Sequence, residues 1–479
     1  MAWWLLILGG CGDEPLARPW PAASTAETVV IDTGGSGDTA DPDDTGGVVD
    51  TGGTVDTGST ADTGPVPLVG PVLYPDDRVQ SPITGWVASE LQRVAGTGTG
   101  QVDVFMKVGA SSTVSSSTLA CYAGDRVDLD RYHELLAHTW RFHLDGDAAG
   151  DTPYDRSTLA AKSGKTAAWV IDGSPSPLED EIAAIDPSVA VIHYGTNDMG
   201  MGSTYESAMP GFYEAMAELL DGLIDDGIVP VVTGISHRGD REAADLWAET
   251  YNAVIRGMAQ VRQVPFIDLH LAMDPLDDHG LASDGLHLNG YAEGDCVLTP
   301  EGLEHGYPMR NLIVLQALDR VAGALWEGDD PPDSAGALLG GEGSPARPFV
   351  IDDLPFADGR DTRDSAHRNL DAYSGCDSTA DESGPELSYR FSLARETALR
   401  LVVLDQGSTD IDVHLLDETG SEAGCLARDD RAIAGTLAAG DYRVVLDSWV
   451  DSGGDVRAGE YLFVIQPCEP GDEDCATRL

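Results

Sequence analysis

The chain has 479 residues, of which 28 are Lys or Arg and 82 are Asp or Glu, so its formal net charge at pH 7 is −54. A charge of this sign and size repels the phosphates of nucleic acids, which argues against nucleic acid as a partner. A chain of this length usually exceeds what one hydrophobic core organises. We therefore expect two folded domains joined by connecting segments.

The first eleven residues resemble a bacterial lipoprotein signal. An apolar run ends in two glycines and Cys11, as in signals whose cysteine becomes the lipidated N-terminus. Two features depart from the pattern, since no Lys or Arg precedes the run and the run is short. The sequence thus predicts a protein of the bacterial cell envelope, held at the outer membrane or cell surface by a lipid on Cys11, and leaves open whether the signal is complete.

Residues 12–70 are rich in Thr, Gly, Asp and Pro. Such a segment cannot bury enough apolar surface to offset the entropy lost on ordering, so we expect a disordered tether. Asp-Thr-Gly occurs five times, starting at Asp32, Asp44, Asp50, Asp56 and Asp62, and resembles an aspartic protease signature. A protease would need two such loops from two packed halves, so that two carboxylates share a proton, and closely spaced copies in a coil do not favour that function.

Residues 71–327 show the pattern of a folded α/β domain. Short apolar runs rich in β-branched residues predict strands at residues 102–108, 189–193, 229–233 and 265–269. Apolar residues at helical spacing predict helices at residues 212–224, 243–261 and 311–326. This succession predicts a parallel sheet with helices on both faces.

Residues 328–347 are rich in Gly, Pro, Asp and Ser, which indicates a linker to a second domain at residues 348–479. In that domain apolar and polar residues alternate around residues 387–393, 399–403, 411–415 and 442–446. The alternation predicts a small, jelly-roll-like antiparallel β-sandwich.

Three short segments of the α/β domain carry chemically useful side chains. The first predicted strand leads into Gly109-Ala110-Ser111, and the second into Gly195-Thr196-Asn197-Asp198. Farther on, Asp284-Gly285-Leu286-His287 places a carboxylate and an imidazole on one loop. A serine nucleophile needs a base, the base needs an acceptor that fixes its tautomer, and the developing oxyanion needs fixed donors such as an amide.

In this order, the three segments resemble blocks I, III and V of the SGNH (GDSL-like) hydrolase family, over about residues 71–326. The resemblance implies a flavodoxin-like, three-layer α/β/α fold and a serine esterase without metal or other cofactor. It implies that Ser111 is the nucleophile, His287 the base and Asp284 the acid that orients it. The amide of Asn197 and the backbone N–H of Ser111 would bind the oxyanion.

The resemblance is incomplete at two places. The block II glycine of the oxyanion hole corresponds to Gly164 in Ser163-Gly164-Lys165-Thr166, with Gly124 and Gly173 as competing candidates. Ala110 stands where the family usually has aspartate. This departure keeps open a catalytically impaired binding lipoprotein as the alternative function, and Ser112 as an alternative nucleophile.

The remaining histidines and cysteines call for separate interpretations. We expect most of the other histidines to be structural or to face substrate, because they lack close metal-ligand spacing and so predict no zinc site; they include His193, His237, His270, His279 and His305. Besides Cys11, six cysteines suit an oxidising compartment. A fold that brings Ser111 and His287 together would allow Cys121 to pair with Cys296, although two unrelated buried thiols stay open as the alternative. Cys376 with Cys425 and Cys468 with Cys475 complete the expected set of pairs.

The β-rich region resembles a bacterial pre-peptidase C-terminal domain over about residues 348–467, through segments at residues 384–391, 410–413 and 439–445. The resemblance implies an accessory role without chemistry of its own. Asp405, Asp410 and Asp412 are possible calcium ligands, although solvated aspartates are common in so acidic a chain. A tethered enzyme with such an appendage suits polymers, so the first substrate expected is O-acetylated carbohydrate, acted on by a monomer. Lipid and thioester substrates stay open.

Overall fold

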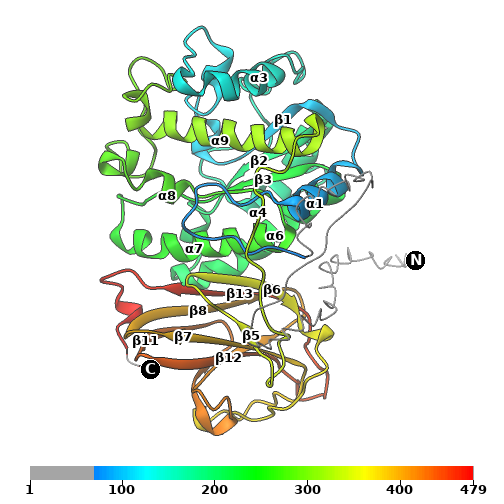
Figure 1. Ribbon diagram of the computed structural model, residues 1–479, viewed down its shortest axis with the longest axis vertical. Helices are drawn as coiled ribbons and strands as arrows, with labels where there is room; N and C mark the ends of the chain where they lie inside the picture. The colour runs from blue at the N-terminus through cyan, green and yellow to red at the C-terminus, as the bar shows by residue number, and fades with distance from the viewer. Residues whose placement is uncertain (1–69, 478) are drawn as a thin grey trace, which may run out of the picture.

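The structure is a computed structural model that describes residues 70–477 and residue 479. The predicted lipoprotein signal with Cys11, and all but the last residue of the predicted tether, lie outside the described residues. An α/β domain and a β-sandwich are stacked along the long axis of the molecule (Figure 1). Among the described helices, none is long and apolar enough to cross a lipid bilayer.

The sheet of the α/β domain is parallel, as predicted. Its described strands pair in the order β1 (Gln101–Gly109), β2 (Pro187–His193), β3 (Val229–Thr233) and β4 (Phe266–Ile267). Every residue of β2 and β3 is buried, which explains their continuous apolar sequences. A parallel bridge from Gly109 to Ala161 places Ala161 on the outer side of β1. With that segment counted, the order across the sheet is flavodoxin-like.

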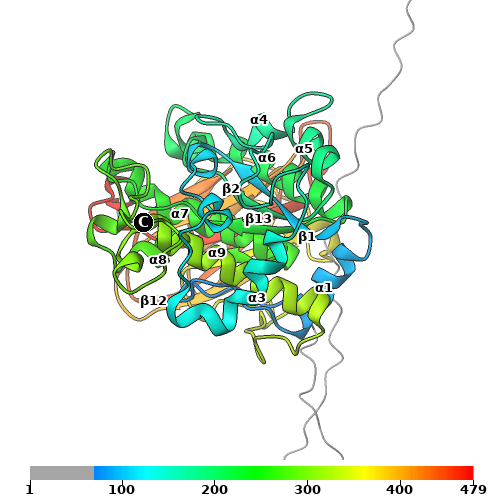
Figure 2. The same cartoon turned by 90° about the horizontal axis from the view of Figure 1, so that it is seen from above.

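Helices cover both faces of this sheet (Figures 1 and 2). One face is covered by α1 (Gly85–Ala95), α3 (His133–Leu144) and α9 (Gly306–Ala322), and the other by α4 (Ala167–Ile171), α5 (Pro177–Ile185), α6 (Tyr205–Asp225) and α7 (Glu242–Arg262). The three-layer α/β/α fold predicted from the sequence is therefore confirmed.

Several predicted boundaries are wrong. Helix α6, predicted from residue 212, begins at Tyr205. The fourth strand ends at Ile267, because Asp268 accepts a hydrogen bond from the Leu271 N–H at 3.0 Å and so starts helix α8 (Leu269–Met273). Helix α9 begins at Gly306 rather than at Asn311, and its α-helical part ends at Ala322. The apolar pattern missed its first turn, where the Asn289 side chain accepts a hydrogen bond from the Gly306 N–H at 2.7 Å.

The second domain is a sandwich of two sheets. One sheet has the order β10-β9-β12-β7-β5 and the other the order β11-β8-β13-β6. The strands are β5 (Phe349–Val350), β6 (Phe356–Asp361), β7 (Glu386–Leu393), β8 (Thr397–Asp405), β9 (Ile411–Leu416), β10 (Cys425–Asp429), β11 (Ala432–Leu437), β12 (Gly440–Ser448) and β13 (Glu460–Pro467). Apolar side chains of both sheets form one core. The predicted antiparallel pairing is correct except for β5, which pairs with β7 in parallel.

The two domains share a buried interface in which α7 lies against β6 and β13 (Figure 1). Gly257 allows the close approach, because a Cβ there would lie 2.9 Å from the Ala357 Cβ. The Gln260 side chain donates to the Ala357 carbonyl at 2.7 Å. Arg400 of the sandwich is buried against the Trp247 ring and pairs with Asp472 at 2.7 Å. The sandwich is therefore packed onto the α/β domain.

Three disulfide bonds lie in the part of the chain that the structure describes. They join Cys121 to Cys296, Cys376 to Cys425 and Cys468 to Cys475, with Cα–Cα distances of 5.5, 5.3 and 6.4 Å. All three predicted pairings are confirmed.

Candidate active site

Ser111 lies directly beyond the carboxyl end of β1, at the start of the short helix α2 (Ser111–Val114). The turn before it requires glycine, because a Cβ on Gly109 would lie 2.7 Å from the His193 carbonyl oxygen and 2.2 Å from the Thr113 hydroxyl. The Ser111 hydroxyl lies 2.9 Å from Nε2 of His287. The structure thus brings together a serine and a histidine that are 176 positions apart in the sequence.

His287 and Asp284 come from one tight loop. The Ala282 N–H donates to the His287 carbonyl at 2.7 Å, and Gly285 has a left-handed φ of +66°. Asp284 Oδ2 lies 2.8 Å from His287 Nδ1, while Asp284 Oδ1 accepts the backbone N–H groups of Leu286 and His287 at 3.0 Å each. These bonds, the one from the His287 ring first, lower the Asp284 pKa to about 2. An ionised Asp284 favours the tautomer with hydrogen on Nδ1, which leaves Nε2 free to accept the serine proton.

Asn197 follows β2 and lines the same cleft as Ser111 and His287. One hydrogen of its amide is donated to the Lys165 carbonyl at 2.9 Å, and the amide has a second hydrogen to offer. The next residue, Asp198, accepts the N–H groups of Ala167 at 2.8 Å and Gly195 at 3.0 Å. Asp198 therefore fixes the loop that carries Asn197.

Gly164 belongs to the loop that Asn197 contacts through Lys165. It is exposed and has a left-handed φ of +73°, but it is absent from the residues that line the cleft, as are Gly124 and Gly173. The structure thus brings the Gly164 loop to the site, while the role of the Gly164 N–H stays a prediction.

The cleft beside Ser111 is small and opens to solvent, with a volume of about 20 Å³, which is room for a group slightly larger than a water molecule. It is lined by Ala110, Ser111, Ser112, His193, Tyr194, Gly195, Thr196, Asn197, Asp198, Leu286 and His287. Burial lowers the pKa of His193 well below its usual range, so this imidazole is neutral at pH 7. Ala110 adds a methyl group where the family resemblance implies a carboxylate.

The sequence interpretation did not identify Arg310, a residue of α9 that supports the segment carrying Ser111. Its buried guanidinium donates to the Ser112 carbonyl at 3.2 Å. The Thr118 hydroxyl donates to the same carbonyl. An arginine within a helix normally faces solvent, so the sequence carried no signal for this contact.

The Cys121–Cys296 disulfide joins the segment after Ser111 to the segment after His287. Asn311 of α9 reinforces this connection, because its amide donates to the carbonyls of Ser117 at 2.8 Å and Asp295 at 3.0 Å. The two segments that supply the serine and the histidine are therefore fixed to each other.

Comparisons with solved structures give low identities and TM-scores. A GDSL-like lipase from Bacteroides thetaiotaomicron is 16% identical, covers 48% of this chain and 97% of its own, and has a TM-score of 0.29. A two-domain esterase active on acetylated mannans is 11% identical and has a TM-score of 0.29. The match covers 80% of this chain and 95% of the esterase. The pre-peptidase C-terminal domain of a Bacillus anthracis collagenase is 13% identical and has a TM-score of 0.17. The match covers 24% of this chain and 92% of the collagenase domain.

A sequence comparison with curated proteins finds no match. A comparison with protein-family models finds the GDSL-like lipase/acylhydrolase family at residues 116–292. The matched region begins shortly after Ser111 and includes Asn197, Asp284 and His287. Over residues 116–292, the α/β domain of this chain is therefore similar to the GDSL-like lipase/acylhydrolase family.

Proposed function

We propose that the α/β domain hydrolyses carboxylic esters, with Ser111 as nucleophile, His287 as general base and Asp284 as the residue that orients the base. The observation that carries this proposal is the unbroken hydrogen-bond chain from the Ser111 hydroxyl through the His287 ring to Asp284, with distances of 2.9 and 2.8 Å. The chain opens into a cleft that also contains Asn197.

In the first half-reaction, His287 Nε2 takes the proton of Ser111 as its oxygen attacks the ester carbonyl carbon. The carbonyl oxygen becomes an anion, which the Asn197 amide and the N–H groups of Ser111 and Gly164 stabilise. The intermediate then collapses, and the C–O bond to the alcohol breaks as His287 returns its proton to the leaving oxygen. A water molecule attacks the acyl-serine by the same route in the second half-reaction, which releases the acid and restores Ser111.

The acyl group of the proposed substrate is short. A cleft of about 20 Å³ beside the nucleophile suits the methyl group of an acetyl ester better than a long acyl chain. We place such esters on carbohydrate polymers, because the sandwich beside the hydrolase domain suits the binding of an extended ligand, and we place the enzyme at the cell envelope through a lipid on Cys11.

The test compares Ser111→Ala and Ser112→Ala with the wild-type protein on p-nitrophenyl acetate, butyrate and octanoate and on an acetylated oligosaccharide. We expect turnover of the acetate and little of the octanoate by the wild type. Ser111→Ala should abolish the turnover of p-nitrophenyl acetate, whereas Ser112→Ala should keep most of this turnover. Turnover that survives in Ser111→Ala but not in Ser112→Ala would move the nucleophile to Ser112. A correctly folded wild-type protein without turnover on any ester would favour a binding protein.

A further inference from the structure

Three histidines that are scattered in the sequence lie together next to the Asp284 loop. His237 follows β3, His270 belongs to α8, and His279 belongs to the turn Asp277–Gly280. The ring of His237 lies between the other two, with centroid distances of 3.5 Å to His270 and 3.8 Å to His279. Because β3 and β4 are neighbouring parallel strands, the segments that follow them lie at the same edge of the sheet as the Asp284 loop.

Carboxylates surround these imidazoles. His237 Nε2 lies 2.8 Å from Asp274 Oδ1, and His237 Nδ1 lies 3.7 Å from Asp245 Oδ1. His270 Nδ1 lies 3.2 Å from Glu249 Oε1. Two sets of possible metal ligands result, each with its donor atoms within 4.8 Å of one another: His237 with Asp245 and His270, and His237 with Asp274 and His279.

The backbone around His279 adopts an unfavourable conformation. Asp278 and His279 have φ values of 50° and 53°, and Gly280 follows with a φ of 65°. For a residue with a side chain, the left-handed region costs about 1–2 kcal/mol, and such residues persist where the surrounding structure holds them, often at functional sites. This conformation brings the His279 ring to His237.

The cluster is accessible to solvent. It borders a cavity of about 390 Å³ lined by His237, Asp245, Asp278, His279 and residues of the Asp284 loop. His237 and His270 are buried, whereas His279 and Asp274 are exposed. An ion could therefore enter from solvent, reach preplaced imidazoles and keep water molecules in its remaining positions.

We propose that this cluster binds one divalent metal ion, Zn²⁺ or a similar ion such as Co²⁺, with His237 as the central ligand. Imidazole nitrogen together with carboxylate oxygen is a donor set that zinc and its neighbours prefer, whereas calcium and magnesium prefer oxygen alone. The ion is held by His237, one further histidine and one aspartate. It ties the segment after β3 to α8 or to the turn Asp277–Gly280. That turn directly precedes the loop of Asp284 and His287, so an ion held by His279 also stabilises this loop without taking part in the ester chemistry.

This assignment reverses the expectation from the sequence, in which the same histidines showed no metal-ligand spacing. Their separations of 33 and 9 positions reflect three different segments that meet at the sheet edge, and sequence spacing detects only ligands that share one loop or helix. The assignment needs no assumption about the substrate, because ion binding is measured without one.

The test is calorimetric titration of the chelator-treated protein, purified without a polyhistidine tag, with Zn²⁺, Co²⁺, Ca²⁺ and Mg²⁺. We expect one Zn²⁺ ion per chain and a rise in melting temperature with Zn²⁺ and Co²⁺. If His279 is the second histidine ligand, hydrogen exchange at residues 277–288 should also become slower. His237→Asn should weaken Zn²⁺ binding by at least about 100-fold. His270→Asn and His279→Asn identify the second histidine ligand, since only one of them should weaken binding comparably.

The matched control is His138→Asn, an exposed histidine of α3 that pairs with Glu327 at 3.1 Å; it should bind Zn²⁺ like the wild type. Binding by the wild type that His237→Asn leaves unchanged would overturn the assignment, as would equal effects of Ca²⁺ and Zn²⁺. If His237→Asn does not fold, the wild-type titration still decides, because the absence of stoichiometric binding to the folded protein overturns the proposal.

Discussion

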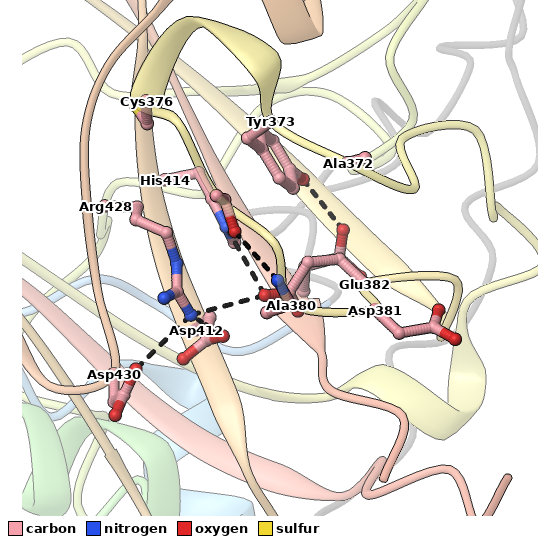
Figure 3. A network of polar contacts seen from close by, with 12 residues as sticks. Ala372, Tyr373, Cys376, Ala380, Asp381, Glu382, Asp412, His414, Arg428 and Asp430 are labelled. Carbon is pink, nitrogen blue, oxygen red and sulfur yellow. Dashed lines mark hydrogen bonds and ion pairs between the residues drawn. The ribbon is translucent and has the colours of Figure 1, made fainter. Parts of the chain in front are cut away.

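Two groups of histidine and carboxylate side chains, one in each domain, differ in access and alignment. In the α/β domain, the side chains of His287 and Asp284 are 35% and 52% exposed, and the imidazole joins the carboxylate to the Ser111 hydroxyl. In the sandwich, Glu382, Asp412 and His414 are buried next to Arg428 (Figure 3). His414 Nε2 lies 3.8 Å from Glu382 Oε1, beyond hydrogen-bond distance.

The surroundings of the sandwich cluster suppress its acid–base chemistry. The His414 ring stacks on Tyr373 at a centroid distance of 3.5 Å, and burial lowers the His414 pKa to about 3. Burial also raises the pKa of Glu382. Arg428 lies 3.3 Å from Glu382 and contacts Asp412, so a cation is already present where the donor set alone would suggest a metal. The same residue types thus serve packing in one domain and form a candidate catalytic site in the other.

The largest expected effect is the different consequence of replacing His287 and His414 by alanine. His287→Ala should lower kcat/KM for p-nitrophenyl acetate by about 10⁴-fold or more, because His287 is the base that contacts the Ser111 hydroxyl, while the melting temperature stays near that of the wild type. His414→Ala should do the reverse, with a loss of about 2–4 kcal/mol in the free energy of unfolding from the cavity it leaves. Ester kinetics and thermal unfolding measure both. A large loss of kcat/KM in folded His414→Ala would contradict the comparison.

The second effect concerns the oxyanion. Asn197→Ala should lower kcat by about 10²–10³-fold with a smaller change in KM, because the amide is expected to act on charge that develops only in the transition state. The Asn197 bond to the Lys165 carbonyl also supports the loop, so circular dichroism must show a native fold. A rise in KM alone would assign Asn197 to substrate binding instead.

The third effect concerns the disulfides of the two domains. Replacing Cys121 and Cys296 by serine should lower the free energy of unfolding by about 2–5 kcal/mol and also reduce kcat, because this bond joins the segments of Ser111 and His287. The matched double replacement of Cys376 and Cys425, in the sandwich, should lower stability and leave kcat unchanged. Equal kcat values for both variants in their folded state would show that the first bond does not position the site.

The sequence predicted the parallel sheet and the sandwich because apolar periodicity is a local property of the chain. The Cys121–Cys296 pair was predictable because the order of the motifs implies a fold that brings the segments of Ser111 and His287 together. It missed Arg310 and the cluster around His237, since both depend on which segments, distant in the sequence, meet in the folded chain. It placed residue 269 in a strand because the apolar run extends past the cap formed by Asp268. The positions of Ser111, Asn197 and the Asp284 loop were predictable, whereas the hydrogen bonds that fix them were not.

The smallest expected effect is a pH dependence of the free energy of unfolding that comes from Glu382 of the sandwich. Because the Glu382 pKa is raised in the folded protein, this carboxyl binds its proton more tightly there than in the unfolded chain. Its contribution to stability is therefore fully present below the ordinary glutamate pKa of about 4.3 and is lost as the pH rises above that value. Glu382→Gln keeps the neutral shape of the side chain, so denaturant unfolding of this variant should depend less on pH between about 5 and 9. The exposed Glu396→Gln is the control and should keep the wild-type slope. An unchanged slope in Glu382→Gln would mean that Arg428 holds the carboxylate ionised, which would make the sandwich cluster a buried ion pair.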